Sequence, residues 1–216
     1  LTQSIAHLDA WGGTHPELGM KMANNILKNN SSNESGTRQR IVVMFTDGEP
    51  GDYEFDDAVA NATVAQAYET KHTYGATVYT VGLIPNPGDN VEKFLNAVSS
   101  NYPDAQDYKG PHSYSPVYAG QLDKNSKYYI KSGNSYKEVH YYEAQVIESF
   151  SGWYSGSKEY TPKTDANDTN KKHTQFYSRQ ELDAQYDKYY MHTGDADELN
   201  KIFSNIAEDT THASVE

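Results

Sequence analysis

Cysteine is absent from this chain of 216 residues. Its absence excludes disulfide scaffolds, thiolate metal sites and cysteine nucleophiles. Long apolar segments are also lacking, because the longest uninterrupted run, Ile41–Phe45, is far too short to span a bilayer. We therefore predict that the chain does not insert into a membrane.

Positive charge is scarce as well. Lys and Arg number 18 against 30 Asp and Glu, which gives a net charge of −12 and disfavours nucleic acid and anionic membranes as partners. Residues 109–186 are the exception, with ten basic and nine acidic side chains. Six acids lie close together in the sequence: Asp47, Glu49, Asp52, Glu54, Asp56 and Asp57. They fit either a solvated loop with the first turn of a helix, or a negative field around a cation.

Sequence patterns typical of common enzyme classes are missing too. The eight His residues show neither His-x-x-x-His nor His-Glu-x-x-His spacing, so a zinc hydrolase has little support. No Ser lies in a Gly-x-Ser-x-Gly elbow, and no Gly-rich phosphate loop is present. We predict a protein that is not an enzyme.

Apolar strands alternate with helical patterns in two parts of the chain. Residues 41–46 and 77–83 have the composition of buried parallel strands, and a last strand is predicted near Tyr189–Met191. Helices are predicted at 15–29, 55–73, from Asp89 onward and at 195–206. This alternation is typical of an α/β fold with a doubly wound, mostly parallel sheet.

The helical patterns also predict core faces and caps. Capping boxes are expected at Asp89–Glu92 and Asp195–Glu198, and Gly75 is expected to close the second helix. The inward faces are predicted to be Leu18, Met22, Ala23, Ile26 and Leu27; Val91, Phe94, Leu95 and Val98; and Leu199, Ile202, Phe203 and Ile206.

Residues 109–186 interrupt this alternation and are predicted to be a small β-rich insertion. Residues 127–131 and 136–146 favour a hairpin around a Ser-Gly-Asn-Ser turn, 152–160 favour another strand and turn, and 161–172 favour a loop. The insertion holds 11 of the 19 Tyr residues and Trp153. These rings fit either packing within strands or a recognition face for glycans or proteins.

Two polar residues are candidates for a metal site. Thr14 follows Gly12-Gly13 before a helix, and Asp47 follows the buried strand at the sheet edge where ligands of α/β proteins bind. A hydroxyl and a carboxylate are oxygen ligands that suit Mg²⁺. Thr14-x-x-Glu17 also fits a capping box, and Asp47-Gly48 also fits an ordinary turn. Glu49 and Asp52 are weaker candidates.

Gly12-Gly13-Thr14 before a helix, and an apolar strand ending in Thr46-Asp47-Gly48, resemble the second and third parts of the metal-ion-dependent adhesion site of von Willebrand factor A domains. The strand at 77–84, residues 94–103 and the closing 195–206 segment are similar to the A-domains of Gram-positive surface adhesins and pilus-tip proteins. The resemblance covers 1–108 and 187–216.

This resemblance implies that Thr14 and Asp47 contact Mg²⁺, or Ca²⁺ or Mn²⁺, directly or through water. The family's first motif, Asp-x-Ser-x-Ser, is absent. The chain also lacks an initiator Met, so we expect it to be the C-terminal portion of an A-domain from a longer protein. A complete metal site is then expected to need the N-terminal half of the same domain.

The function that the resemblance implies is adhesion at a bacterial cell surface, cell wall or pilus tip, or by a secreted protein. The expected partner is a protein ligand, such as host extracellular matrix, or a glycan. The alternative is a structural or assembly module of a surface stalk or pilus that needs no metal.

Overall fold

Parallel pairing of two apolar segments forms the centre of the fold. In the computed structural model, which describes residues 12–30, 39–117, 126–139 and 175–212, β1 (Ile41–Thr46) pairs in parallel with β2 (Thr77–Gly82). β2 also pairs in parallel with β7 (Tyr190–His192). The predicted adjacency of the first two strands and the predicted last strand are therefore confirmed. The order β1-β2-β7 puts β1 at one edge of the described sheet, called here the parallel sheet.

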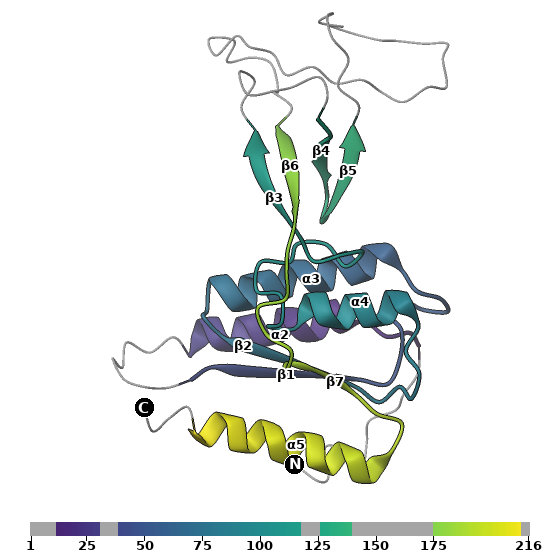
Figure 1. Cartoon of the computed structure of the whole chain (residues 1–216), viewed down its shortest axis with the longest axis vertical. Helices are drawn as coiled ribbons and strands as arrows, with labels where there is room; N and C mark the ends of the chain where they lie inside the picture. The colour runs from purple at the N-terminus through teal and green to yellow at the C-terminus, as the bar shows by residue number, and fades with distance from the viewer. Residues whose placement is uncertain (1–11, 31–38, 118–125, 140–174, 213–216) are drawn as a thin grey trace, which may run out of the picture.

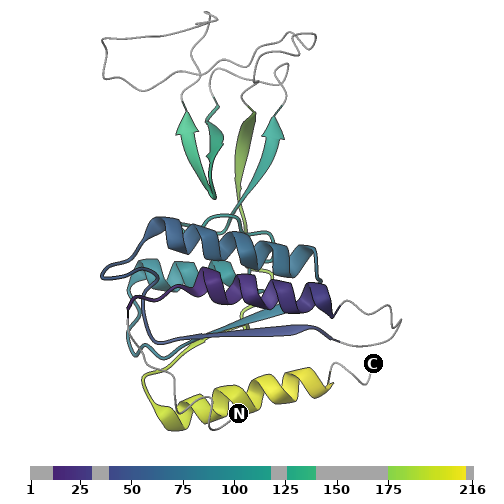
Figure 2. The same ribbon diagram turned by 180° about the vertical axis from the view of Figure 1, so that it is seen from behind.

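Helices cover both faces of the parallel sheet. α2 (Pro16–Asn29), α3 (Asp57–His72) and α4 (Asp89–Val98) lie on one face, and α5 (Ala196–His212) lies on the other (Figures 1 and 2). The molecule is thus a mixed α/β protein in which helices and parallel strands alternate along the chain. Within the described ranges, no helix is long and apolar enough to cross a membrane.

Side chains of β2 point alternately to the two faces of the parallel sheet and contribute to a hydrophobic core on each face. Val78 packs in the core against α3 and α4, whereas Tyr79 and Val81 pack against α5, because successive strand side chains point to opposite faces. The predicted inward face of α4 is confirmed, since its four predicted residues are 0–2% exposed: Val91, Phe94, Leu95 and Val98. Among the α5 residues whose burial is described, only Ile206 is buried, and Phe203 is 41% exposed beside the ring of Phe45.

The predicted core face of α2 is wrong for three of its five residues. Leu18, Met22 and Ile26 are 60%, 65% and 57% exposed. α2 instead turns Met20 and Asn24 inward, because the Asn24 side chain binds α3 through hydrogen bonds to the Gln66 carbonyl, the Gln66 side chain and the Thr70 hydroxyl. The hydrogen bonds of Asn24 to α3 thus set the rotation of α2 about its axis. They leave the three apolar residues above, called here the α2 stripe, on the solvent side of the helix.

The predicted capping box is half formed at α5 and absent at α4. Asp195 accepts hydrogen bonds from the backbone N–H groups of Asp197 and Glu198, as a helix N-cap does. The Glu198 carboxylate, however, accepts a hydrogen bond from the Thr193 hydroxyl at 2.7 Å instead of returning to the Asp195 N–H, which donates to Thr193. α4 begins one residue earlier than predicted, with Gly88 as its N-cap and Asp89 already helical. Asp89 pairs instead with Lys93 one turn later. Gly75 follows α3 with the positive φ of 60° that suits glycine there.

A second, antiparallel sheet rises beyond α3 and α4 (Figure 1). This upper sheet has the order β3-β6-β4-β5, with β3 (His112–Val117), β4 (Tyr128–Ser132), β5 (Ser135–Val139) and β6 (Phe176–Glu181). The predicted hairpin is present as β4 and β5. Residues 140–146, 152–160 and 161–172, with Trp153, lie outside the described residues.

Tyrosine rings hold the upper sheet together. Tyr114 and Tyr136 stack with ring centroids 3.7 Å apart, and Tyr129 and Tyr177 contact this pair edge-on. Tyr128 packs edge-on against Phe176 in a separate small core. For these five Tyr residues the packing interpretation is therefore the better one.

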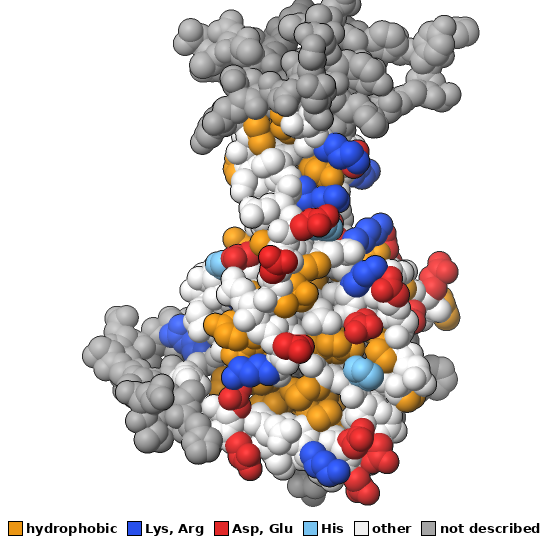
Figure 3. Space-filling model, in the orientation of Figure 1, with side chains coloured by type: hydrophobic (Ala, Val, Ile, Leu, Met, Phe, Trp, Pro, Cys, Tyr) orange, Lys and Arg blue, Asp and Glu red, His pale blue; other side chains and the backbone are white. Residues whose placement is uncertain are grey.

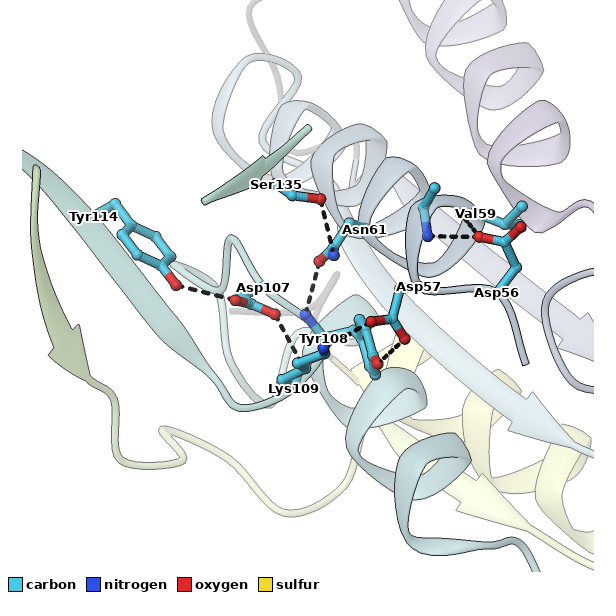
Figure 4. A network of polar contacts seen from close by, with 10 residues as sticks. Asp56, Asp57, Val59, Asn61, Asp107, Tyr108, Lys109, Tyr114 and Ser135 are labelled. Atoms are coloured by element: carbon cyan, nitrogen blue, oxygen red, sulfur yellow. Dashed lines mark hydrogen bonds and ion pairs between the residues drawn. The ribbon is translucent and has the colours of Figure 1, made fainter. Parts of the chain in front are cut away.

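A polar network joins the upper sheet to α3 (Figure 4). Asp57 on α3 accepts a hydrogen bond from the Tyr108 hydroxyl and pairs with Lys109 at 2.7 Å. Asn61 on the same helix donates to the Ser135 hydroxyl of β5 at 3.3 Å. The hydroxyl of Tyr114, on β3, donates to Asp107 at 3.0 Å. The contacts of Asp57 and Asn61, called here the joint, tie β5 and the segment before β3 to α3.

Candidate functional site

The segment that carries Thr14 is fixed against the loop that follows β1. The Thr14 N–H donates to the Gly51 carbonyl at 2.8 Å, and the Gly51 N–H donates to the Thr14 carbonyl at 2.9 Å. Gly13 permits this approach, because a Cβ there would lie 2.3 Å from the Gly51 oxygen. Gly12 has a φ of 103°, which favours glycine.

The loop after β1 brings Asp47 into the same region. The Thr46 hydroxyl donates to the Gly48 carbonyl at 3.1 Å, which forms a tight turn around Asp47. A Cβ on Gly48 would lie 2.6 Å from Thr14 Oγ1, so the Thr14 hydroxyl lies directly against the residue after Asp47. The two predicted site residues therefore come from segments that meet at the carboxyl edge of the parallel sheet.

The capping interpretation of Thr14 is wrong. α2 has His15 at its N-cap position, and no side chain caps it. Glu17 does not reach back to the backbone of Thr14, because its carboxylate bonds His15 Nδ1 at 3.1 Å. Pro16 at the start of the helix also removes one of the N–H donors that a cap would serve.

Thr14 and Asp47 keep their oxygen atoms available. Within the described ranges, neither side chain makes a hydrogen bond or ion pair, and Asp47 is exposed. Several other acids of the 47–57 region have structural roles: Asp52 bonds His15 at 3.1 Å, Asp56 caps α3, and Asp57 belongs to the joint. Asp52 is therefore a poor ligand candidate, and Glu49 remains exposed and unpaired among the described residues.

His15 borders the site and was not predicted to have a role there. Its ring lies between two carboxylates, and hydrogen bonds to Asp52 and then Glu17 raise its pKa above the ordinary value. The contact with Asp52 links the start of α2 to the loop after β1. The sequence gives no signal for this pair, because the two residues are 37 positions apart.

The oxygen atoms of Thr14 and Asp47 are of the type that a hard cation binds, but two side chains are too few to complete its coordination. A hydroxyl and a carboxylate are ligands that Mg²⁺ prefers, whereas a stable Mg²⁺ site needs six oxygen positions. No group of three or more His, Asp or Glu side chains that could hold a metal occurs in the part of the chain that the structure describes. Thr14 and Asp47 alone would leave the ion mostly hydrated.

Comparisons with known proteins identify no relative: no protein-family model, no curated protein and no solved structure matches the chain.

Proposed function

We propose that this chain is part of a non-enzymatic adhesion module that binds its ligand through a divalent cation at the carboxyl edge of the parallel sheet. The observation that carries the proposal is the meeting of Thr14 with the Thr46-Asp47-Gly48 turn. Thr14 and Asp47 would hold the ion, and an acidic group of the partner would complete its coordination. The cation supplies the attraction for that group.

The finer fold that we propose is a doubly wound A-domain of the von Willebrand factor type, with residues 109–186 inserted before the last strand and helix. Parallel order β1-β2-β7, with helices on both faces, supports it. The strands of the upper sheet lie between His112 and Glu181, inside the proposed insertion. Such modules act at Gram-positive cell surfaces and pilus tips.

A missing N-terminal part of the domain would explain the exposed apolar surface beside β1. Val43 and Phe45 on β1 are 39% and 47% exposed, and the α2 stripe is more exposed still. Apolar side chains and an open strand edge are features that a neighbouring strand and helix normally cover. The same N-terminal part would supply the first metal motif. In this proposal, one missing part therefore accounts both for the exposed apolar side chains and for the incomplete set of metal ligands.

The test is cation-dependent binding to extracellular-matrix proteins. The chain is immobilised, and binding of collagen, fibronectin and fibrinogen is compared in a large excess of Mg²⁺ and in EDTA. We expect binding that EDTA abolishes and that Asp47→Asn reduces, while the control Glu54→Gln in the same loop leaves it unchanged. Binding that is equal in EDTA, or that Asp47→Asn leaves unchanged, would favour a metal-independent structural module of a surface stalk.

A further inference from the structure

The upper sheet contains an open pocket of about 560 Å³. It borders β4 and β6, which two residue pairs join: Tyr129 with Tyr177 and Ile130 with Phe176. Its lining is mostly polar and comes from three strands and the segment before β4: Val117, Ser126, Lys127, Tyr128, Tyr129, Ser178 and Arg179. The volume lies within the range of small-molecule sites, roughly 300–1,000 Å³.

Arg179 is the lining residue with the clearest capacity to bind an anion. Its guanidinium lies over the Tyr129 ring, 5.1 Å from the centroid. Among the described residues it makes no hydrogen bond or ion pair, and its side chain is exposed. The cation–π contact holds the guanidinium beside the ring, and a guanidinium can form two parallel hydrogen bonds to a carboxylate.

The residues around Arg179 favour a ligand that carries negative charge. Lys127 contributes a second cation to the lining, and its only described partner is Glu138, 3.2 Å away at the surface. Figure 3 shows Lys and Arg side chains along one side of the upper sheet, while Asp and Glu are common over the rest of the visible face. Because Glu138 compensates Lys127 and also accepts from the Tyr129 hydroxyl, Arg179 is the one cation of the described lining without a described ion-pair partner, and it is the group that can attract an anion here.

The remaining lining selects the kind of anion. Ser126 and Ser178 are hydroxyl residues, and Val117 is the only aliphatic residue among the described lining residues. Tyr128 and Tyr129 are each only 4% exposed, so their rings form the wall of the pocket. The Ser178 hydroxyl has only a long, 3.5 Å contact with the Ser115 carbonyl. A ligand can replace this weak contact at little cost. A ligand rich in hydroxyl groups matches this lining better than an apolar one.

We propose that this pocket binds a sugar unit that carries a carboxylate, with Arg179 holding the carboxylate and polar groups of the lining contacting the ring. The site is separate from the sheet edge at Asp47 and needs no metal. Its ligand chemistry is therefore that of an acidic saccharide, and recognition would be by charge and hydroxyl contacts within the upper sheet.

The test is an NMR titration of the whole chain with glucuronate, and with glucose as the neutral control. We expect glucuronate to bind and to shift the amide signals of residues 127–129 and 178–179, and glucose to bind about tenfold more weakly or worse. Arg179→Gln should lose about tenfold in affinity, and Arg179→Lys should lose less, since it keeps the charge. Lys131→Gln, which changes a cation outside the lining, should bind like the original chain.

Two further arms separate this site from others. EDTA and Asp47→Ala should leave glucuronate binding unchanged, so failure of the metal proposal would not affect the result. Arg179→Gln should still unfold in one cooperative thermal transition, because its side chain is exposed and its described contact is with the Tyr129 ring alone. Equal binding of glucuronate and glucose, no binding of either, unchanged binding by Arg179→Gln, or tighter binding of a triaspartate peptide would each overturn the proposal.

Discussion

Asn61 on α3 accepts a hydrogen bond from the backbone N–H of Tyr108 at 3.2 Å, through a side chain that is only 5% exposed. The same side chain donates to Ser135 of β5. One carboxamide thus serves both the chain segment that leaves the parallel sheet and the hairpin of the upper sheet (Figure 4).

Asn61→Ala should therefore destabilise the protein and loosen this joint. Removing the carboxamide leaves a buried backbone donor unpaired, which costs about 1–3 kcal/mol. Urea unfolding should give that loss, and hydrogen exchange at the Tyr108 amide should accelerate more than exchange in β2. Asn90→Ala, at an exposed position, is the matched control and should change neither. An unchanged Tyr108 exchange rate would mean that the joint does not depend on this residue.

Lys71 makes stability depend on pH. Burial lowers the pKa of its ammonium group from 10.5 to about 7, and Asp104 offsets part of that effect. Between these two values the unfolded chain binds a proton that the folded protein releases, so stability should rise with pH, by at most about 1.4 kcal/mol per unit. Chemical unfolding between pH 7 and 9 measures this rise.

The matched pair for that experiment is Lys71→Met and Lys93→Met. Lys71→Met should flatten the profile, while Lys93→Met, at a surface ion pair with Asp89, should leave it unchanged. Four backbone carbonyls lie around the Lys71 ammonium, from Tyr102 at 2.9 Å to Val98 at 3.3 Å. A flat profile in the original chain would show that these acceptors keep the group charged.

His15 should titrate above its ordinary pKa of 6.5, because Asp52 and Glu17 stabilise its protonated form. The stability that it contributes is present below pH 6.5 and is lost as the pH rises through the higher folded-state value. Asp52→Asn should lower the pKa of His15, and Glu49→Gln should not. NMR titration of the ring protons measures both, and a pKa that Asp52→Asn leaves in place would disprove the contact in solution.

The strand edge at β1 should make the chain self-associate. Ile41–Thr46 carries no charge and no proline, its outer edge is unpaired within the described sheet, and Val43 and Phe45 are exposed on it. Natural proteins rarely leave such an edge bare. Sedimentation should show species larger than a monomer, and Val43→Lys should reduce them while Tyr186→Lys does not. A soluble monomer with a folded but rapidly exchanging β1 would contradict this.

The parts of the fold that were predictable from the sequence have a local signal. β1 and β2 are short apolar runs, and the face of α4 follows from its helical period. β3 and β6 lack such a signal: His112–Val117 contains Pro116 and few apolar residues, and it pairs with residues 59 to 69 positions away. The rotation of α2 was mispredicted because the hydrogen bonds of Asn24 reach residues more than 40 positions away.

The residues of the candidate site could be predicted from the sequence, but the contacts that surround them could not. Gly12-Gly13-Thr14 and Thr46-Asp47-Gly48 are recognisable as short motifs. The contact of His15 with Asp52 and the placement of Arg179 over Tyr129 join distant segments, so no pattern along the chain indicates them.

The most direct test of the metal-site proposal is a calorimetric Mg²⁺ titration of the chain, of Asp47→Ala and of Glu54→Gln. Two protein ligands leave the ion mostly hydrated, and Mg²⁺ releases water reluctantly, so we predict weak binding, with a Kd of about 1 mM or above. Asp47→Ala should abolish that binding, and Glu54→Gln should keep it. Tight Mg²⁺ binding that survives Asp47→Ala would contradict the account.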